Sequence, residues 1–211
     1  MRNIFRLGTS PTIGTLILPG KPLIEIGKRL DSMIKLTIEP CDKIVAGVKN
    51  NTYDLGLIES PVFDDDLVYK EWMEDELVIC SLKALPENLN EEELSHCNLL
   101  CRNRNSPTRM FINDFFDKVD LSYETFYSLS EIDNASAAIQ GIKWSKPNRE
   151  HPTVAIVSQL AIEDELKQES LHQSRIKNSP MIRKFYLIYN KSDNEHNYID
   201  DIIHYLQAWQ D

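Results

Sequence analysis

The chain has 211 residues, of which 33 are Asp or Glu and 23 are Lys or Arg, so its formal net charge is −10. This acidic balance excludes the basic surface of a DNA-binding domain, because phosphate contacts depend on Lys and Arg side chains. Hydrophobic residues at 42% and charged residues at 27% are typical of a folded protein. The length allows one large domain or two domains of about 100 residues each.

The sequence carries no sign of export or of a membrane span. Its first residues, MRNIFRLGTS, lack the apolar core of a signal peptide, and no stretch reaches the roughly 18 consecutive apolar residues of a span. We therefore expect a cytoplasmic protein with no membrane contact. The cysteines are too few for a disulfide scaffold, so we expect reduced thiols. They are Cys41, Cys80, Cys97 and Cys101.

Short aliphatic runs alternate with helical patterns, which is typical of βα units and a largely parallel sheet. The expected strands are Ile4–Gly8, Ile34–Ile38, Leu55–Ile58, Leu77–Cys80, Asn98–Cys101, Thr125–Leu129, Val154–Val157 and Phe185–Tyr189. The expected helices are Thr12–Leu30, Asp42–Asn50, Pro107–Val119, Ile132–Ile142, Gln159–Lys167 and Tyr198–Trp209. The first helix contains PGKP at 19–22, so we expect a kink or two segments there.

Two Ser-Pro pairs mark expected helix starts just after predicted strands. Ser10 precedes Pro11 and Ser106 precedes Pro107, so each serine can cap a helix that begins with proline. A helix N-terminus also binds anions, and ligands of open α/β sheets collect beyond the carboxyl ends of strands. Two such turns facing each other would form a cleft for an anion, with Arg102, Arg104 or Arg109 nearby. The alternative is that both serines only cap their helices.

Three more candidates follow predicted strands. Glu59 and Ser60 follow Leu55–Ile58, and Ser158 follows Val154–Val157. A carboxylate at Glu59 could accept a hydrogen bond from a ligand amine, which would favour an amino acid or another zwitterion. The alternative is a solvated acidic loop, because three aspartates follow at 64–66.

Signatures of catalysis and of metal binding are absent from the sequence. There is no GxSxG, Walker A, GxGxxG or HExxH motif. His96, Cys97 and Cys101 could suggest a zinc site, but no second CxxC or HxxxH completes a tetrahedral set. We therefore expect no catalytic residues, no metal and no cofactor.

Seven segments, in their order along the chain, resemble the effector-binding (substrate-binding) domain of LysR-type transcriptional regulators. The resemblance extends from Ile4 to Trp209. The segments are RLGTSPTIGTLILP (6–19), YDLGLIESPV (53–62), DELVICS (75–81), CRNRNSPTR (101–109), SAAIQGI (136–142), VAIVSQLAIEDEL (154–166) and RKFYLIYNK (183–191). Each motif is weak alone, and the seven in the family's order are specific together.

The resemblance implies an α/β chain of the type 2 periplasmic-binding-protein-like fold, with two α/β subdomains joined by two crossover strands. These strands would lie near Val78–Ser81 and Arg183–Tyr189. Subdomain I would comprise 1–81 plus 185–211, and subdomain II 82–184. The family's small-molecule effector binds between the subdomains. Carried over by motif, the effector-binding residues are Ser10, Pro11, Thr12, Glu59, Ser60, Asn105, Ser106, Thr108 and Ser158, and Arg104 lies beside them.

The sequence departs from the family's pattern in two ways. The segment KWSKPNREHPT at 143–153 replaces a short glycine turn, and we expect it to reshape the wall near Ser158. The family's winged helix-turn-helix domain and linker helix are missing, so DNA would be reached only through that N-terminal domain. Family domains pair antiparallel, which implies a homodimer or higher homo-oligomer through the helices Thr12–Leu30 and Ile132–Ile142.

The predicted function is a sensor domain that binds a small anionic or zwitterionic effector and controls transcription by a LysR-type regulator. The main alternative is a solute-binding protein of a transport system with the same fold, which the missing signal peptide disfavours. A further alternative is an enzyme on this fold, such as a prephenate dehydratase-like protein. The lack of a visible acid, base and nucleophile set disfavours it.

Overall fold

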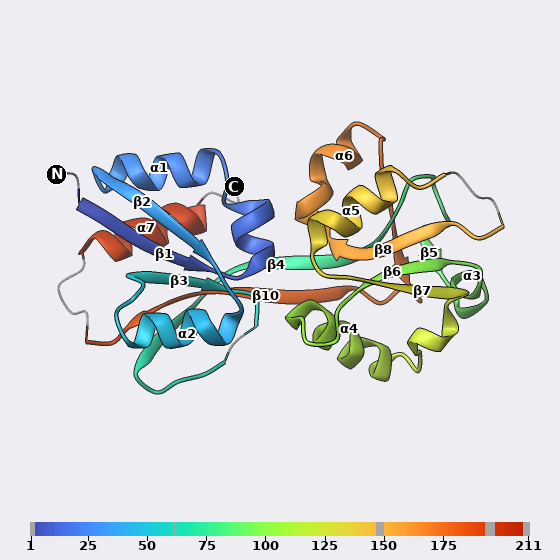
Figure 1. The fold of residues 1–211 in the computed structure, drawn as a ribbon, viewed down its shortest axis with the longest axis horizontal. Helices are drawn as coiled ribbons and strands as arrows, with labels where there is room; N and C mark the ends of the chain where they lie inside the picture. The colour runs from blue at the N-terminus through green and yellow to red at the C-terminus, as the bar shows by residue number, and fades with distance from the viewer. Residues whose placement is uncertain (1–2, 61, 147–149, 193–196, 209–211) are drawn as a thin grey trace. The chain divides into compact units, whose positions relative to one another are not determined.

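The computed structural model describes residues 3–60, 62–146, 150–192 and 197–208 (Figure 1). The chain forms two compact units: the first joins Met1–Glu74 to Arg183–Asp211, and the second is Asp75–Ile182. No helix in these described ranges is long and apolar enough to cross a membrane.

Two long strands contribute residues to both units. They are β4 (Leu67–Ser81) and β10 (Met181–Asn190), and they are hydrogen-bonded neighbours. The two crossover strands expected from the resemblance lie within them. The subdomain boundaries expected after residues 81 and 184 stay a prediction, since the contact-based units divide after residues 74 and 182.

In the first unit, three parallel strands and one antiparallel strand lie side by side, next to the first half of β4. They are β1 (Asn3–Thr9), β2 (Ser32–Ile38), β3 (Leu55–Ile58) and β10, in the order β2-β1-β3-β10. Thr9 pairs with both Ile38 and Leu57, so the carboxyl ends of the parallel strands meet at one edge. Strand β2 ends this order and is an edge strand.

Four helical segments accompany these strands. They are η1 (Ile13–Ile17, a π-helical turn), α1 (Lys21–Arg29), α2 (Cys41–Lys49) and α7 (Asn197–Ala208). Helices α1 and α7 touch each other, and Figure 1 shows them on the face of the strands opposite α2. The expected break in the first helix is confirmed. The chain turns at Gly20 with φ at 106°, which glycine adopts without strain.

Tyr53 holds α2 against the sheet. Its ring is buried, and its hydroxyl donates to Glu39 Oε2 at 2.7 Å. A Cβ added at Gly47 would lie 2.4 Å from the Tyr53 ring, and one added at Gly8 would lie 2.7 Å from it. The ring therefore fits because positions 8 and 47 carry no side chain, and α2 lies close to β1.

The second unit combines the second half of β4 with five more strands. They are β5 (Asn88–Leu89), β6 (Asn98–Arg102), β7 (Ser128–Ile132), β8 (Thr153–Ser158) and β9 (His172–Ile176). Strand β6 lies between β7 and β8, and all three are parallel, so their carboxyl ends share an edge. Strands β8 and β9 pair antiparallel with β4, and β7 ends the order.

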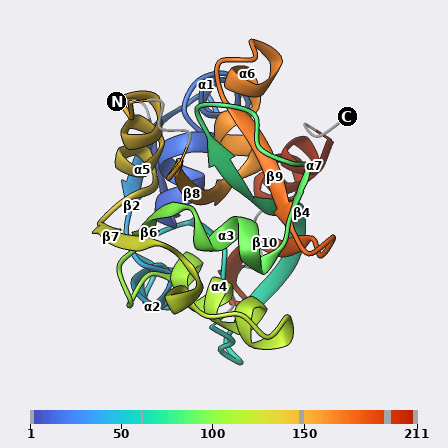
Figure 2. The same ribbon diagram turned by 90° about the vertical axis from the view of Figure 1, so that its right-hand side faces the viewer.

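Helices cover both faces of the second unit's strands. They are α3 (Glu91–Ser95), α4 (Pro107–Lys118), η2 (Tyr123–Thr125), α5 (Ala135–Lys143), η3 (Gln159–Ile162) and α6 (Glu163–Lys167). Figures 1 and 2 show α4 and α5 on opposite faces. Phe116 of α4 is central to the apolar core, with ring centroids 4.9 Å from Tyr123 and 6.1 Å from Phe126.

Two predicted elements are displaced by caps that the sequence analysis did not identify. The strand expected at Thr125–Leu129 forms later as β7, because Ser122 caps the 3-10 turn η2 ahead of it. The helix expected at Ile132–Ile142 begins later as α5. There Asn134 accepts a hydrogen bond from the Ala137 N–H at 2.8 Å and sets the start.

The remaining differences concern elements that the sequence analysis missed or merged. The helix expected at Gln159–Lys167 is the 3-10 turn η3 followed by α6. Strands β5 and β9, helix α3 and the first part of β4 were not predicted. The last helix is confirmed as α7, although Trp209 lies outside the described residues.

Candidate functional site

Ser10 lies at the carboxyl edge of the first unit, directly after β1. Its N–H donates to the Leu57 carbonyl and its own carbonyl accepts from the Gly14 N–H, both at 2.9 Å. The side chain is 0% exposed, yet its Oγ has no hydrogen-bond partner among the described residues. The interpretation of Ser10 as a helix cap is therefore wrong, and its hydroxyl is left to bind something else.

The neighbours of Ser10 extend this buried polar edge. Thr9 is also fully buried, and its Oγ1 likewise lacks a partner within the described part of the chain. Thr12 is buried, Pro11 is half-buried, and η1 begins without a side-chain cap. A buried hydroxyl without a partner costs about 1–3 kcal/mol, so an incoming acceptor would relieve that cost.

Glu59 forms a buried ion pair with Arg183. Glu59 follows β3, and Arg183 lies on β10, which pairs antiparallel with β3. Glu59 Oε2 lies 2.7 Å from Arg183 Nη1, and the two side chains are only 2% and 4% exposed. The angles at this contact do not meet the geometry of a hydrogen bond, so it is an ion pair between two opposite charges at short distance. The alternative of a solvated acidic loop is wrong for Glu59, whose charge is balanced within its own unit.

Ser60 is half-buried and lies beside Cys41, the first residue of α2. The backbone N–H groups of Glu59 and Ser60 point toward the Cys41 sulfur. Burial, followed by the charge of Glu59, raises the pKa of the Cys41 thiol to about 11. This thiol therefore stays protonated near neutral pH and is not poised as a nucleophile.

Ser106 caps α4 at the carboxyl edge of the second unit. Its Oγ accepts a hydrogen bond from the Arg109 N–H at 3.0 Å, and Pro107 is the first helical residue, as the sequence predicts. Ser106 and Thr108 are buried, whereas Arg104 and Asn105 are exposed. The Ser106 hydroxyl keeps its own proton to donate, so it can cap the helix and still contact an anion.

The other two arginines of this turn hold the turn together. Arg109 is buried, lies 3.4 Å above the Tyr123 ring centre and donates to the Arg102 carbonyl at 3.1 Å. Arg102 is also buried, and its Nε donates to the Asp133 carbonyl at 3.2 Å. Arg104 is thus the exposed cation of the turn, which is the position that the sequence analysis selected.

Ser158 ends β8 and donates its hydroxyl to Asp75 Oδ1 at 2.6 Å. Both side chains are buried, and Ser158 pairs with Leu77 across β4 and β8. With its proton directed at Asp75, Ser158 can offer a ligand only an acceptor lone pair. The sequence analysis missed Asp75 and Arg183, because each meets its partner only through strand pairing.

Cys97 and Cys101 belong to the core of the second unit rather than to a metal site. Cys97 Sγ donates to the Glu93 carbonyl at 3.4 Å, and Cys101 Sγ donates to the Ser130 carbonyl at 3.6 Å. Burial raises the pKa of Cys97 to about 11. In the described ranges, no group of three His, Cys, Asp or Glu residues is placed to hold a metal ion.

The structure therefore divides the ten candidate residues equally between the two units. The first unit holds Ser10, Pro11, Thr12, Glu59 and Ser60, and the second holds Arg104, Asn105, Ser106, Thr108 and Ser158. Within each unit they lie at the carboxyl edge of the parallel strands, where open α/β sheets bind ligands.

The family model described as "LysR substrate binding domain" matches residues 1–211. The chain belongs to this family. The LysR substrate-binding domain has the type 2 periplasmic-binding-protein-like fold, so both the predicted family and the predicted fold are confirmed.

Known proteins similar to this LysR substrate-binding domain are distant in sequence. The uncharacterized HTH-type transcriptional regulator YeiE of Escherichia coli K12 is 23% identical over 204 residues, which are 95% of this chain and 66% of YeiE. The regulatory domain of Synechocystis PCC6803 CcmR has 18% identity and a TM-score of 0.76, covering 99% of this chain and 97% of that one. The QuiR effector-binding domain has 13% identity and a TM-score of 0.72, and the match covers 99% of this chain and 97% of the QuiR chain.

The two serines of this LysR substrate-binding domain should respond differently to truncation. Ser106→Ala removes a helix cap, so we expect the free energy of unfolding to fall by about 1 kcal/mol. Ser10→Ala removes a hydroxyl that has no hydrogen-bond partner among the described residues, so we expect the free energy of unfolding to stay the same or to rise slightly. Urea unfolding of both variants measures the difference. Equal losses would contradict these assignments.

Proposed function

We propose that the chain is the ligand-sensing domain of a LysR-type transcriptional regulator and binds a small anionic effector at the carboxyl edges of its strands. The observation that carries the proposal is the fully buried Ser10 hydroxyl without a described partner, at the edge where the fold binds ligands. Two of the similar structures were determined with small molecules, CcmR with 2-PG and QuiR with shikimate.

The charges at the two edges favour an anion over a zwitterion. Glu59 is already paired with Arg183 at 2.7 Å, so its negative charge is balanced within the protein and attracts a ligand amine less strongly. The donors that remain are the hydroxyls of Ser10 and Ser106, the N-terminus of α4 and the exposed Arg104. All of these groups attract negative charge.

In the full-length regulator, effector binding would control DNA binding in the cytoplasm, with DNA reached through the domain that carries the helix-turn-helix. The name of the relative YeiE, a transcriptional regulator, favours this function over a transport solute-binding protein. We propose that the ligand is bound without turnover, because the chain belongs to the LysR substrate-binding family and its relative YeiE is named as a transcriptional regulator.

A thermal-shift screen tests the proposal. The probes are sulfate, phosphate, dicarboxylates, aromatic acids and amino acids, added to the purified chain. A ligand at 100 times its Kd adds about 2.7 kcal/mol, which is about 5–10 °C for a domain of this size. We expect shifts confined to anions. No shift with any probe would overturn ligand sensing and favour control through partners or oligomerisation.

A matched pair of variants links any shift to the site. Ser106→Leu should abolish the ligand-induced shift, because a bulky apolar side chain then occupies the start of α4. Ser122→Leu removes another cap hydroxyl of the same unit, so it controls for the loss of stability alone and should keep the shift. An unchanged shift in Ser106→Leu would remove Ser106 from the site.

We also propose that the chain forms a homodimer through the helices α1 and α5 and through the edge strands β2 and β7, which contact them. Apolar side chains are exposed on or beside both edge strands, β2 and β7. An exposed edge strand with apolar neighbours tends to pair with another chain, so these residues favour an interface. Ile24 and Met33 lie on α1 and β2, and Leu129 and Trp144 lie on β7 and directly after α5. Of these elements, α1 and α5 correspond to the two helices through which the resemblance pairs the subunits, and β2 and β7 are the strands next to them.

Light scattering tests the dimer. We expect about twice the monomer mass of 24.4 kDa at micromolar concentration, and the monomer mass for Met33→Glu. Met110→Glu is the matched control, because Met110 is similarly exposed but lies on α4, which is not one of the proposed interface elements. A monomer at all concentrations, or a dimer that survives Met33→Glu, would refute this interface.

A further inference from the structure

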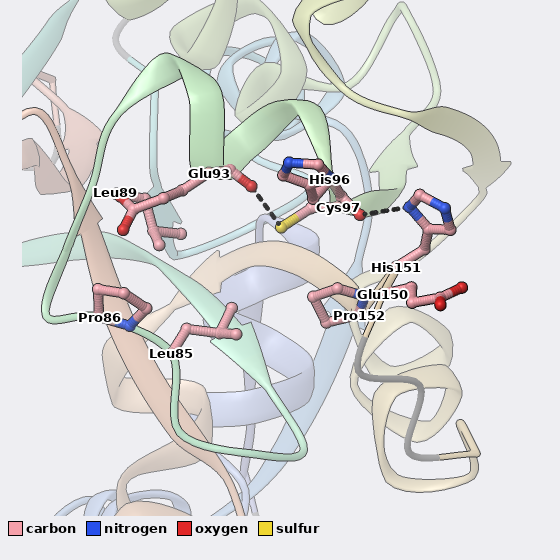
Figure 3. Close-up of a pocket in the computed structure, with 9 residues that line it drawn as sticks. All are labelled: Leu85, Pro86, Leu89, Glu93, His96, Cys97, Glu150, His151 and Pro152. Carbon is pink, nitrogen blue, oxygen red and sulfur yellow. Dashed lines mark hydrogen bonds between the residues drawn. The ribbon is translucent and has the colours of Figure 1, made fainter.

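A cavity of about 570 Å³ lies in the second unit (Figure 3). Its lining is largely apolar, with Leu85, Leu89 and Pro152 on its walls, and its polar groups include Glu93, Glu150 and His151. This size and this mixture of an apolar wall with few polar groups are typical of small-molecule sites.

The cavity is separate from the proposed effector site. It adjoins the amino ends of β6 and β8, whose first residues are Asn98 and Thr153, whereas Ser106 and Ser158 follow the carboxyl ends of the same strands. The two sites therefore lie at opposite edges of one group of parallel strands. A ligand of one site does not compete directly with a ligand of the other.

Hydrogen bonds fix the walls of the cavity. Asn90 and Glu93 form a reciprocal capping box, in which Glu93 Oε2 accepts from the Asn90 N–H at 2.8 Å. On the other side, Asn98 N–H donates to the Pro152 carbonyl at 2.9 Å and Asn98 Nδ2 donates to the His151 carbonyl at 2.8 Å. The cavity is thus held between α3 and the start of β8 without a ligand.

The polar groups of the lining determine the charge of the occupant. The half-buried Glu93 carboxylate lies beside Leu89, and Glu150 lies at the opposite side near Pro152 (Figure 3). The Glu93 carboxylate at this apolar wall attracts a cation and repels an anion. The His151 ring is stacked on Tyr127 with centroids 3.6 Å apart, and its Nδ1 lies 3.1 Å from the His96 carbonyl, so this ring is held at the rim.

We propose that this cavity is a second ligand site, which takes a small apolar amine. The apolar part of the ligand contacts Leu85, Leu89 and Pro152, and its ammonium group pairs with the Glu93 carboxylate. The capping box uses one oxygen of that carboxylate, and the second oxygen accepts from the ammonium.

Benzylamine, benzyl alcohol and benzoate test the proposal, because they share one apolar body and differ in charge. Each is titrated into the ¹⁵N-labelled chain while amide shifts are followed by NMR. We expect saturable amide shifts at residues 85, 87–89, 93–97 and 150–151, with benzylamine binding at least tenfold more tightly than benzoate. Shifts from benzylamine at other amides only, or equal affinity of the amine and the acid, would overturn the proposal.

Two matched variants assign the charge. Glu93→Gln keeps the capping box, because glutamine also accepts from the Asn90 N–H, but it removes the carboxylate charge. We expect Glu93→Gln to weaken the binding of benzylamine at least fivefold and to leave the binding of benzyl alcohol unchanged. Glu92→Gln removes an exposed charge of the same helix outside the cavity and should change neither. The same loss in both variants would contradict a role for Glu93.

Discussion

Replacing Arg183 with methionine will lower the free energy of unfolding by about 3–5 kcal/mol, because it leaves the Glu59 carboxylate buried without its cation. Both side chains are almost fully buried, so water cannot compensate for the lost charge. Urea unfolding measures the effect.

Two controls separate the buried charge from the loss of side-chain contacts. The double variant Glu59→Gln with Arg183→Met removes both charges and should recover part of the loss. Lys184→Met removes the next cation along β10, which pairs with Glu71 on the exposed surface at 2.8 Å, and should cost at most about 1 kcal/mol. Similar losses for Arg183→Met and Lys184→Met would contradict the buried pair.

Phe116→Ala will lower the free energy of unfolding by about 3–5 kcal/mol, because it opens a cavity in the core of the second unit. The ring contacts Tyr123 and Phe126, which follow α4 in the chain and pack on the same core. Hydrogen exchange read by mass spectrometry localises the effect. Protection should fall in β6 and β8 of the second unit more than in β1 and β3 of the first.

Met110→Ala is the control for this substitution. Met110 lies on the exposed face of the same helix, so its truncation should change the free energy of unfolding by no more than about 0.5 kcal/mol. An even loss of protection over both units in Phe116→Ala would show that the two units unfold as one.

The elements predicted well from the sequence have local causes. Strands β3 and β8 are short, almost wholly buried aliphatic runs, β1 and β6 are short strands with apolar residues at their centre, and α4 begins at a Ser-Pro cap. Each signal lies within a few residues of the element that it specifies, so no knowledge of distant partners is needed.

The elements that were missed depend on partners far along the chain. Strand β9 has the polar sequence HQSRI, and it is a strand because it pairs with β4 and β5. The first part of β4 mixes buried, half-buried and exposed residues without a regular pattern or a long aliphatic run. Helix α3 has a readable signal, the Asn90 and Glu93 capping box, which the sequence analysis passed over.

The candidate site shows the same division between local and distant causes. The cap at Ser106 was predicted, since it needs only the turn around it. The partner of Ser158 is 83 residues away, and Arg183 reaches Glu59 only through the pairing of β10 with β3. The Ser10 hydroxyl lacks a partner among the described residues even though the Ser10 carbonyl accepts from the Gly14 N–H as at a helix start, which the Ser-Pro pattern does not reveal.

The contact of Tyr53 with two glycines links positions that are distant in the chain. A side chain at 8 or 47 would meet the ring at 2.7 or 2.4 Å, so neither glycine can mutate alone while Tyr53 remains. Tyr53 itself can become Phe at the loss of the hydrogen bond to Glu39. In descendants of this sequence, a side chain at 8 or 47 should appear only after a smaller residue at 53. The order in which substitutions accumulate is therefore constrained here by one aromatic ring.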